Sequence, residues 1–174
     1  MWRADPKTVE AGLAHASGDV EFVLDVAGGA GRVARALDRE TLVVDAARGM
    51  VEQGRSHGVP GVVGDAARLP VRDGAADAVV VADAFHHLPD PENALAEAFR
   101  VLRPGGAIVI REFDPTTLRG RGVALGERLV GFDSTFRAPD ALCGLLADAG
   151  FETALPDRGF GYTAVGVKPE SGEQ

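Results

Sequence analysis

Short apolar runs alternate along this chain with amphipathic segments, and the alternation predicts a fold class. Five runs are valine-rich and apolar at consecutive positions, as strands buried on both faces should be: 22–26, 41–45, 60–63, 77–82 and 106–112. Segments with helical periodicity lie between them, near residues 31–38, 47–56 and 91–102. Strands that alternate with helices imply an α/β fold, with a mostly parallel sheet and helices on both faces.

The last third of the chain is less regular. Ala138-Pro139-Asp140 opens a predicted helix that runs to about residue 149, and segments 151–156 and 160–168 are expected to form a final strand pair that adds an antiparallel strand. Residues 114–135 combine several glycines with apolar residues at helical spacing. Two interpretations stay open for this segment: a core helix packed on the sheet, or a flexible lid that supplies an acceptor pocket or a dimer surface.

Bulk properties favour one cytoplasmic domain. At 174 residues the chain is long enough for a single domain with its own core, and no apolar run approaches the ~18 residues of a membrane span. The N-terminal residues lack the apolar core of a signal peptide, and a lone cysteine, Cys143, fits a reducing compartment. The net charge is −8 and there is no basic block, so nucleic acid is not an expected partner.

The run from Phe22 to Arg32 carries the strongest chemical signal. A strand ends at Asp25, a glycine-rich loop follows, and glycines let a backbone approach a ligand closely. Such a loop suits a nucleotide, but a carboxylate at its entrance would repel the pyrophosphate of a dinucleotide. A ligand with an ammonium group and a sulfonium would be attracted instead. S-adenosylmethionine (SAM) is such a ligand.

Two further carboxylates follow the next two predicted strands. Asp45 ends the second strand, where an acid can accept hydrogen bonds from both ribose hydroxyls; the alternative is an Asp that caps the following helix. Asp65 ends the third strand and could accept from an adenine amino group; the alternative is an ordinary turn residue. Beside the glycine loop, ribose binding is the favoured interpretation for Asp45.

Six motifs in order resemble those of a known family. They are Asp25-Val-Ala-Gly-Gly-Ala-Gly31, Asp45 with Met50, Gly64-Asp-Ala-Ala-Arg-Leu-Pro70, Asp73-Gly-Ala-Ala-Asp77, His86-His-Leu-Pro-Asp90 and Arg100-Val-Leu-Arg-Pro-Gly-Gly106. Together they resemble the successive motifs of class I SAM-dependent methyltransferases, of the broad type 11 small-molecule group. The resemblance is dense over residues 22–112. The first motif, with Glu112-Phe113, is also similar to quinone-biosynthesis C-methyltransferases.

The resemblance implies a Rossmann-like sheet of seven strands, SAM as cofactor with S-adenosylhomocysteine (SAH) as product, and a small or lipid-like acceptor. It places the methionine part of SAM against Asp25, Ala27, Gly29 and Gly31, and the ribose on Asp45. Adenine would be read by Asp65 and the Ala66 amide with Ala46 and Met50 near its faces, and Ala82 and Asp83 would border the activated methyl. The chain departs from the family pattern at Ala27, where a glycine is usual, at Ala47, and in its short stretch before the first strand.

Candidates for a catalytic base are Asp83 and His86, since histidine titrates near neutrality and both follow the fourth strand. Transfer from a sulfonium needs mainly alignment, so a base is optional. For His86 and His87 the alternative is a structural loop histidine. The spacing of His and Cys residues does not suit a metal site.

Three function classes follow. The first is a SAM-dependent methyltransferase. The second is a non-catalytic SAM-binding protein or a subunit that needs a partner or a homodimer to complete its pocket, which the short N-terminal stretch favours. The third is an NAD-dependent oxidoreductase, against which Asp25 argues.

Overall fold

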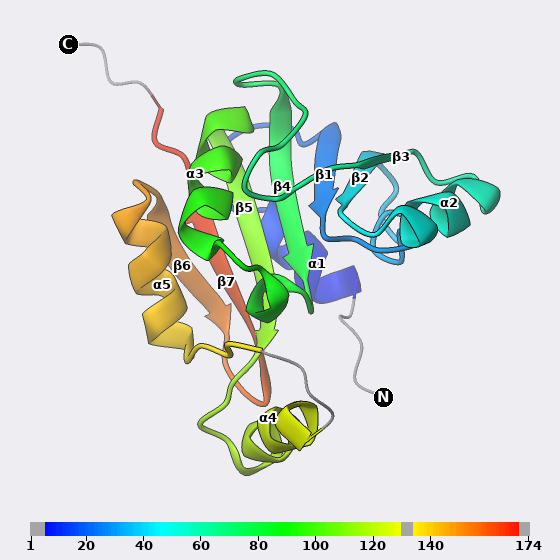
Figure 1. Ribbon diagram of the computed structural model, residues 1–174. Coiled ribbons are helices and arrows are strands. Elements are labelled where there is room, and N and C mark those ends of the chain that lie inside the picture. The colour runs from blue at the N-terminus through cyan, green and yellow to red at the C-terminus, as the bar shows by residue number, and fades with distance from the viewer. Residues whose placement is uncertain (1–5, 130–133, 171–174) are drawn as a thin grey trace.

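The computed structural model describes residues 6–129 and 134–170 and contains one seven-stranded sheet in the order β3-β2-β1-β4-β5-β7-β6 (Figure 1). The strands are β1 (Phe22–Val26), β2 (Glu40–Asp45), β3 (Gly61–Val63), β4 (Ala76–Ala82), β5 (Leu102–Phe113), β6 (Glu152–Asp157) and β7 (Gly161–Val167). Strands β1 to β5 pair in parallel, whereas β7 is antiparallel to both of its neighbours. The predicted α/β fold, including its antiparallel last strand, is confirmed.

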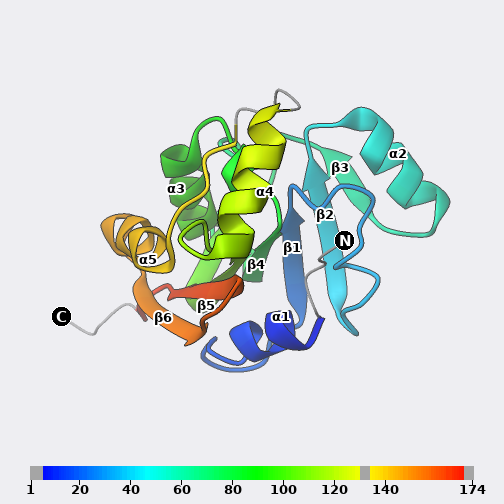
Figure 2. The same cartoon turned by 90° about the horizontal axis from the view of Figure 1, so that it is seen from below.

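Helices cover both faces of the sheet (Figure 2). They are α1 (Pro6–Leu13), α2 (Arg48–Ser56), α3 (Pro91–Val101), α4 (Leu118–Leu129) and α5 (Pro139–Asp148), with a short 3-10 helix η1 (Phe85–His87). The apolar residues of α3 and α5 pack with one side of the strands, as Leu95 and Leu142 do with Ile108. On the other side, Val9 and Leu13 of α1 share a second core with the remaining strand side chains.

The predicted helix at 31–38 is wrong. That segment forms a series of turns, in which i→i+3 hydrogen bonds such as Ala36 N–H to Val33 O mix with single i→i+4 bonds. Gly31 starts it in the left-handed region at a φ of 75°, which a continuous right-handed helix excludes. Val33 and Leu37 are nevertheless buried, so the apolar spacing reflects packing rather than helix formation.

Two further boundaries differ from the sequence-based prediction. α1 lies in the short stretch where no helix is predicted, with Pro6 as its first residue and two buried side chains, Val9 and Leu13, four residues apart. β5 begins at Leu102, the last residue of the predicted helix 91–102, rather than at the predicted residue 106, and its pairing with β4 shifts register between Ala76 and Ala78. Local patterns do not show either feature because both depend on contacts with distant strands.

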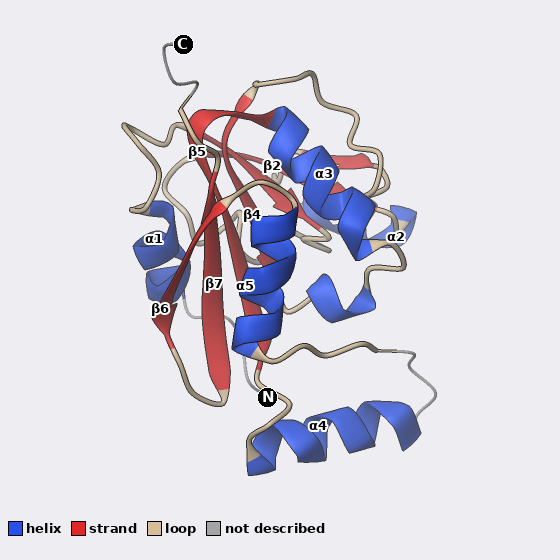
Figure 3. Cartoon of the chain, turned by 90° about the vertical axis from the view of Figure 1, so that its left-hand side faces the viewer, coloured by secondary structure: helices blue, strands red, loops and turns tan. Residues whose placement is uncertain are grey.

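The helix α4 lies beyond the carboxyl ends of the strands, apart from the layers that cover the sheet (Figures 1 and 3). Leu118 is 88% exposed and Leu125 is 59% exposed, so the core-helix interpretation is wrong for these residues. The lid interpretation of 114–135 stays a prediction, and Val130 and Phe132, which support it in the sequence, lie outside the described residues. None of the described helices has the length and apolarity to cross a bilayer.

Candidate functional site

A pocket of about 440 Å³ opens at the carboxyl end of the sheet. Ligands in open α/β sheets bind at this edge, and the volume lies in the range of small-molecule sites. Its walls come from the ends of β1, β2 and β3 and from the turn around η1. The lining residues are Ala27, Val44, Asp45, Ala46, Gly64, Asp65, Ala66, Ala84, His87, Leu88 and Pro89.

The loop after β1 has a left-handed backbone at three positions. Gly29 and Gly31 have φ values of 58° and 75°, and Ala27 has a φ of 54° although it carries a side chain. A Cβ at Gly31 would lie 2.5 Å from Cγ1 of Val59, so glycine is required there for space as well as conformation. Ala27 has no such relief, and a left-handed alanine costs roughly 1–2 kcal/mol.

Asp25 is fully buried beneath this loop rather than on the pocket wall. A Cβ at Gly28 would clash with the Asp25 carboxylate, so only glycine lets the loop close over it. Within the described residues, neither carboxylate oxygen has a hydrogen bond partner of standard geometry. Burial raises the pKa of Asp25 to about 7; the nearby Ala34 amide and the charge of Arg32 oppose this rise, and the charge of Asp45 adds to it.

Asp45 stands on the pocket wall at the end of β2. Its Oδ2 accepts a hydrogen bond from the Gly29 backbone N–H and its Oδ1 accepts one from the Ala47 N–H, both at 2.8 Å. An ionised carboxylate has about four acceptor positions, so about two remain for a ligand. The capping and ligand-binding interpretations of Asp45 are therefore compatible with each other.

The predicted adenine residues are divided between the pocket and the surface. Asp65, Ala66 and Ala46 line the pocket, and Asp65 also makes a local turn by accepting from the Ala67 N–H at 2.9 Å. Met50 lies on α2, is 48% exposed, and is absent from the pocket lining.

Asp83 and Ala82 lie next to the pocket without lining it. Asp83 has a φ of 58°, and its Oδ2 accepts a hydrogen bond of 2.8 Å from Nη2 of Arg32. This ion pair joins the end of β4 to the turns after β1. Because the guanidinium holds the carboxylate, Asp83 is less suited than a histidine to receive a proton.

His86 forms a buried pair with Glu112, the residue before the last of β5. His86 Nδ1 lies 3.0 Å and 2.8 Å from the two Glu112 oxygens, and the His86 backbone N–H donates to Oε1 at 3.3 Å. Both side chains are only 3% exposed. The carboxylate favours a proton on Nδ1, which leaves Nε2 of a neutral ring as the acceptor atom.

Aromatic side chains surround this pair. The ring of Phe136 stacks on His86 at 4.3 Å between centroids, and Phe113 contacts Phe136 and Phe160 at 6.1 Å and 5.2 Å. The chain after α4 is held over the pair, since the Thr135 N–H donates to His86 O at 2.9 Å. The carboxyl end of β5 thus has an apolar aromatic wall beside one acid–histidine pair.

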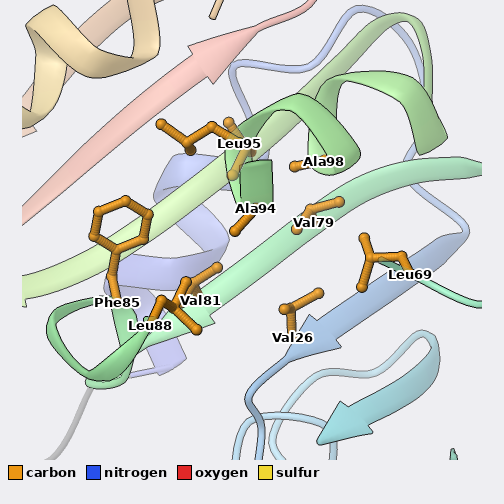
Figure 4. A pocket seen from close by; sticks show the side chains of 10 residues that line it. Val26, Leu69, Val79, Val81, Phe85, Leu88, Ala94, Leu95 and Ala98 are labelled. Atoms are coloured by element: carbon orange, nitrogen blue, oxygen red, sulfur yellow. The ribbon is translucent and has the colours of Figure 1, made fainter. Parts of the chain in front are cut away.

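A smaller cavity lies under the pocket between α3 and the strands (Figure 4). It is about 10 Å³, room for about one water, and its lining is wholly apolar, including Val26, Leu69, Val79 and Phe85. Leu88 lines both cavities, so the smaller one is a packing gap beneath the pocket floor.

The structure therefore brings together Ala27, Asp45, Ala46, Asp65 and Ala66, and it sets the remaining predicted residues behind or beside the pocket. Sequence reasoning assigned no chemical role to Glu112 or Leu88. The signal for Glu112 was present, because an acid that ends an apolar strand at the carboxyl edge is the same feature that selected Asp25 and Asp45.

Comparisons with known proteins agree with this geometry. A family model described as a methyltransferase domain matches residues 24–110. A demethylmenaquinone methyltransferase of Thermus thermophilus is 36% identical, over 59% of this chain and 56% of the relative. A ubiquinone/menaquinone biosynthesis C-methyltransferase of Methylobacterium nodulans is 32% identical, over 74% of this chain and 65% of the relative. The chain spans between about half and two thirds of these relatives.

A solved SAM-dependent methyltransferase of Thermotoga maritima has the same fold, with a TM-score of 0.81 and 24% identity over 94% of this chain and 87% of its own. The fold and the matching family model together define a methyltransferase domain of the class I, Rossmann-like type. The chain belongs to the methyltransferase-domain family and is loosely similar to quinone C-methyltransferases. The relatives named above are all methyltransferases. None of them supports the oxidoreductase alternative or the non-catalytic alternative.

Proposed function

We propose that this chain transfers a methyl group from SAM to a small, lipid-like acceptor. The observation that carries the proposal is the position of Asp45. It stands on the wall of a ligand-sized pocket, anchors the glycine loop through Gly29, and keeps acceptor positions for two vicinal hydroxyls.

The residues of the pocket fit SAM. When bound, SAM supplies a methyl group on a sulfonium, and the neutral thioether SAH remains after transfer. Asp45 would hold the ribose, while Asp65 and the Ala66 amide would pair with adenine at the opposite wall. Ala27 and Leu88 would lie along its apolar parts.

Asp25 is assigned to the methionine end of the ligand. It is a fully buried carboxylate with no hydrogen bond partner of standard geometry among the described residues, directly behind the loop that the ligand would contact. A ligand ammonium near this loop would stabilise the charged form of Asp25, which burial otherwise disfavours. Gly28 packs directly on the carboxylate and neither residue lines the pocket, so a direct contact between Asp25 and the ligand needs a change in the loop.

The acceptor is assigned to the aromatic wall at the end of β5. Phe113, Phe136 and Phe160 offer flat apolar surfaces, and a ring can stack there as Phe136 stacks on His86. The named relatives act in quinone biosynthesis, which supports a lipid-like acceptor with an aromatic ring.

If the methyl-accepting substrate must lose a proton, His86 is the proposed base. Glu112 would hold its Nδ1–H and stabilise the imidazolium, and Phe136 would have to move aside to admit the acceptor. Asp83, Ala82, Gly29, Gly31 and Met50 keep their assigned roles as predictions. A homodimer and a cytoplasmic location likewise stay predictions.

Calorimetric titration tests the cofactor assignment. SAH is expected to bind and NAD is not, and SAH at ~100 times its dissociation constant should add ~2.7 kcal/mol to the stability of the fold. Binding of NAD without binding of SAH would contradict the proposal.

Turnover separates an enzyme from a non-catalytic SAM-binding protein. Incubation with SAM and a panel of phenols, amines and short-chain hydroquinones should yield SAH and a methylated hydroquinone. As a control, a known methyltransferase should methylate compounds of the same panel. If this chain binds SAH but methylates none of them, the non-catalytic class is favoured.

A further inference from the structure

The exposed surface of α4 has a defined composition. Among residues 118–126, the part of α4 whose side chains are described, there are two arginines and no carboxylate, in a chain whose net charge is −8. Leu118 and Leu125 are largely exposed, and Arg119 and Arg121 are exposed beside them. An apolar strip flanked by arginines is typical of helices that lie in the interface of a bilayer.

The orientation of this surface is set by the opposite face of the helix. Gly120 is buried against the backbone of Asp114, where a Cβ would clash with the Asp114 carbonyl oxygen. At 100° per residue, Gly120 is about 200° from Leu118 and about 140° from Leu125. Since Gly120 faces the turn that connects β5 to α4, Leu118 and Leu125 face away from that turn.

The start of the helix is held in place by local hydrogen bonds. The Gly120 N–H donates to Thr117 Oγ1 at 3.0 Å and the Thr116 N–H donates to Asp114 Oδ1 at 2.8 Å. These bonds fix the turn that connects β5 to α4. The helix lies beyond the strand ends in both side views (Figures 1 and 3). A flat surface could therefore meet α4 before it meets the sheet.

We propose that α4 docks on an anionic lipid surface, with Leu118 and Leu125 in the acyl boundary and Arg119 and Arg121 on lipid phosphates. The charge of this surface favours an anionic membrane over a second copy of the chain. In a two-fold dimer through α4, the same patch would meet itself, so arginines would face arginines. An anionic membrane attracts α4 and repels the acidic remainder, which also orients the protein with α4 toward the lipid. Lipid binding by α4 does not depend on methyl transfer.

Flotation of the full chain with vesicles tests the proposal. The wild type should float with vesicles of equal parts phosphatidylglycerol and phosphatidylcholine, should not float with pure phosphatidylcholine, and should be released by high salt. Leu118→Ser and Leu125→Ser should each weaken binding by about tenfold or more, and Arg119→Gln and Arg121→Gln by about fivefold each.

Matched controls are available on other surfaces. Val63→Ser removes an exposed apolar side chain from β3, and Arg72→Gln removes an exposed arginine; both should bind vesicles like the wild type. Thermal unfolding shows that each variant is folded. No flotation of the folded wild type, or equal losses in the controls, would overturn the proposal. A second result would also overturn it: the wild type is a dimer in solution, and Leu118→Ser and Leu125→Ser make it a monomer without changing flotation.

Discussion

Oδ2 of Asp45 accepts a 2.8 Å hydrogen bond from the Gly29 backbone N–H, and this contact ties the end of β2 to the loop after β1. The carboxylate that is predicted to hold the ribose thus also shapes the loop predicted to hold the methionine part. We therefore expect binding of the two ends of the ligand to be coupled through this one side chain.

Replacement of Asp45 tests this coupling. Asp45→Ala should weaken the binding of SAH by roughly 1.5–3 kcal/mol, because hydrogen bonds to a charged group are lost. The loss should be larger if the Gly29 loop also rearranges. Asp45→Asn keeps one acceptor oxygen but places an amide donor against Gly29 or Ala47, so it should lose part of the affinity. Calorimetry measures both, with the exposed Asp38→Asn as control. Unchanged SAH affinity in Asp45→Ala would remove the assignment.

Ala27 offers a test of backbone strain. Its φ of 54° is expensive for alanine and free for glycine, while glycine adds entropy to the unfolded chain. Ala27→Gly should therefore raise the free energy of unfolding by about 0.5–1 kcal/mol. Ala36→Gly, at an exposed position outside the left-handed region, should lower it by about 0.4–1 kcal/mol. Urea titration decides, and a destabilised Ala27→Gly would show that the strain is absent.

The buried Asp25 predicts a pH dependence of stability. Its pKa is raised from 3.8 to about 7, so the folded state binds its proton more tightly than the unfolded state. The contribution of Asp25 to the free energy of unfolding is therefore most favourable below pH 4. It falls by on the order of 4 kcal/mol as the pH rises toward 7.

Asp25→Asn removes this group and reveals its contribution. The free energy of unfolding of the variant, minus that of the wild type, should grow between pH 5 and pH 8 in urea titrations. Asp77→Asn should show a pH dependence of opposite sign. Burial opposes ionisation of Asp77, but hydrogen bonds from the Phe22 N–H, Arg103 and the Glu21 N–H outweigh it and lower the pKa of Asp77. A pH-independent difference for Asp25→Asn would mean that Asp25 is solvated in the folded state.

The His86–Glu112 pair predicts strong coupling in a double-mutant cycle. His86→Phe leaves a buried carboxylate without its partner and Glu112→Leu leaves a buried imidazole, so each should cost about 3–5 kcal/mol. The double variant removes both polar groups and should cost much less than the sum. The same cycle at Asp77 and Arg103, which are 20% and 29% exposed, should show a smaller coupling. Additivity within about 0.5 kcal/mol at His86 and Glu112 would exclude an interacting pair.

Much of the sheet could be read from local patterns. The cores of all seven strands fall in the predicted runs. The central strands are buried on both faces and must be apolar at consecutive positions, as Val79, Val80 and Val81 are. The turns at 31–38 could not be read this way. Val33 and Leu37 have helical spacing, but the left-handed Gly31 and contacts with the second core prevent a helix.

The order of acids along the chain determined most of the pocket. Asp45 and Asp65 end parallel strands, and parallel strands bring their carboxyl ends to one edge, so residues far apart in sequence had to meet. The tertiary structure alone decided how each carboxylate is used. Asp25 is buried under Gly28, Asp83 forms an ion pair with Arg32, and Glu112 pairs with His86, 26 residues away in the sequence. The tertiary structure also left Leu118 and Leu125 of α4 exposed, because the helix has too little contact with the sheet for its apolar spacing to decide which face is buried.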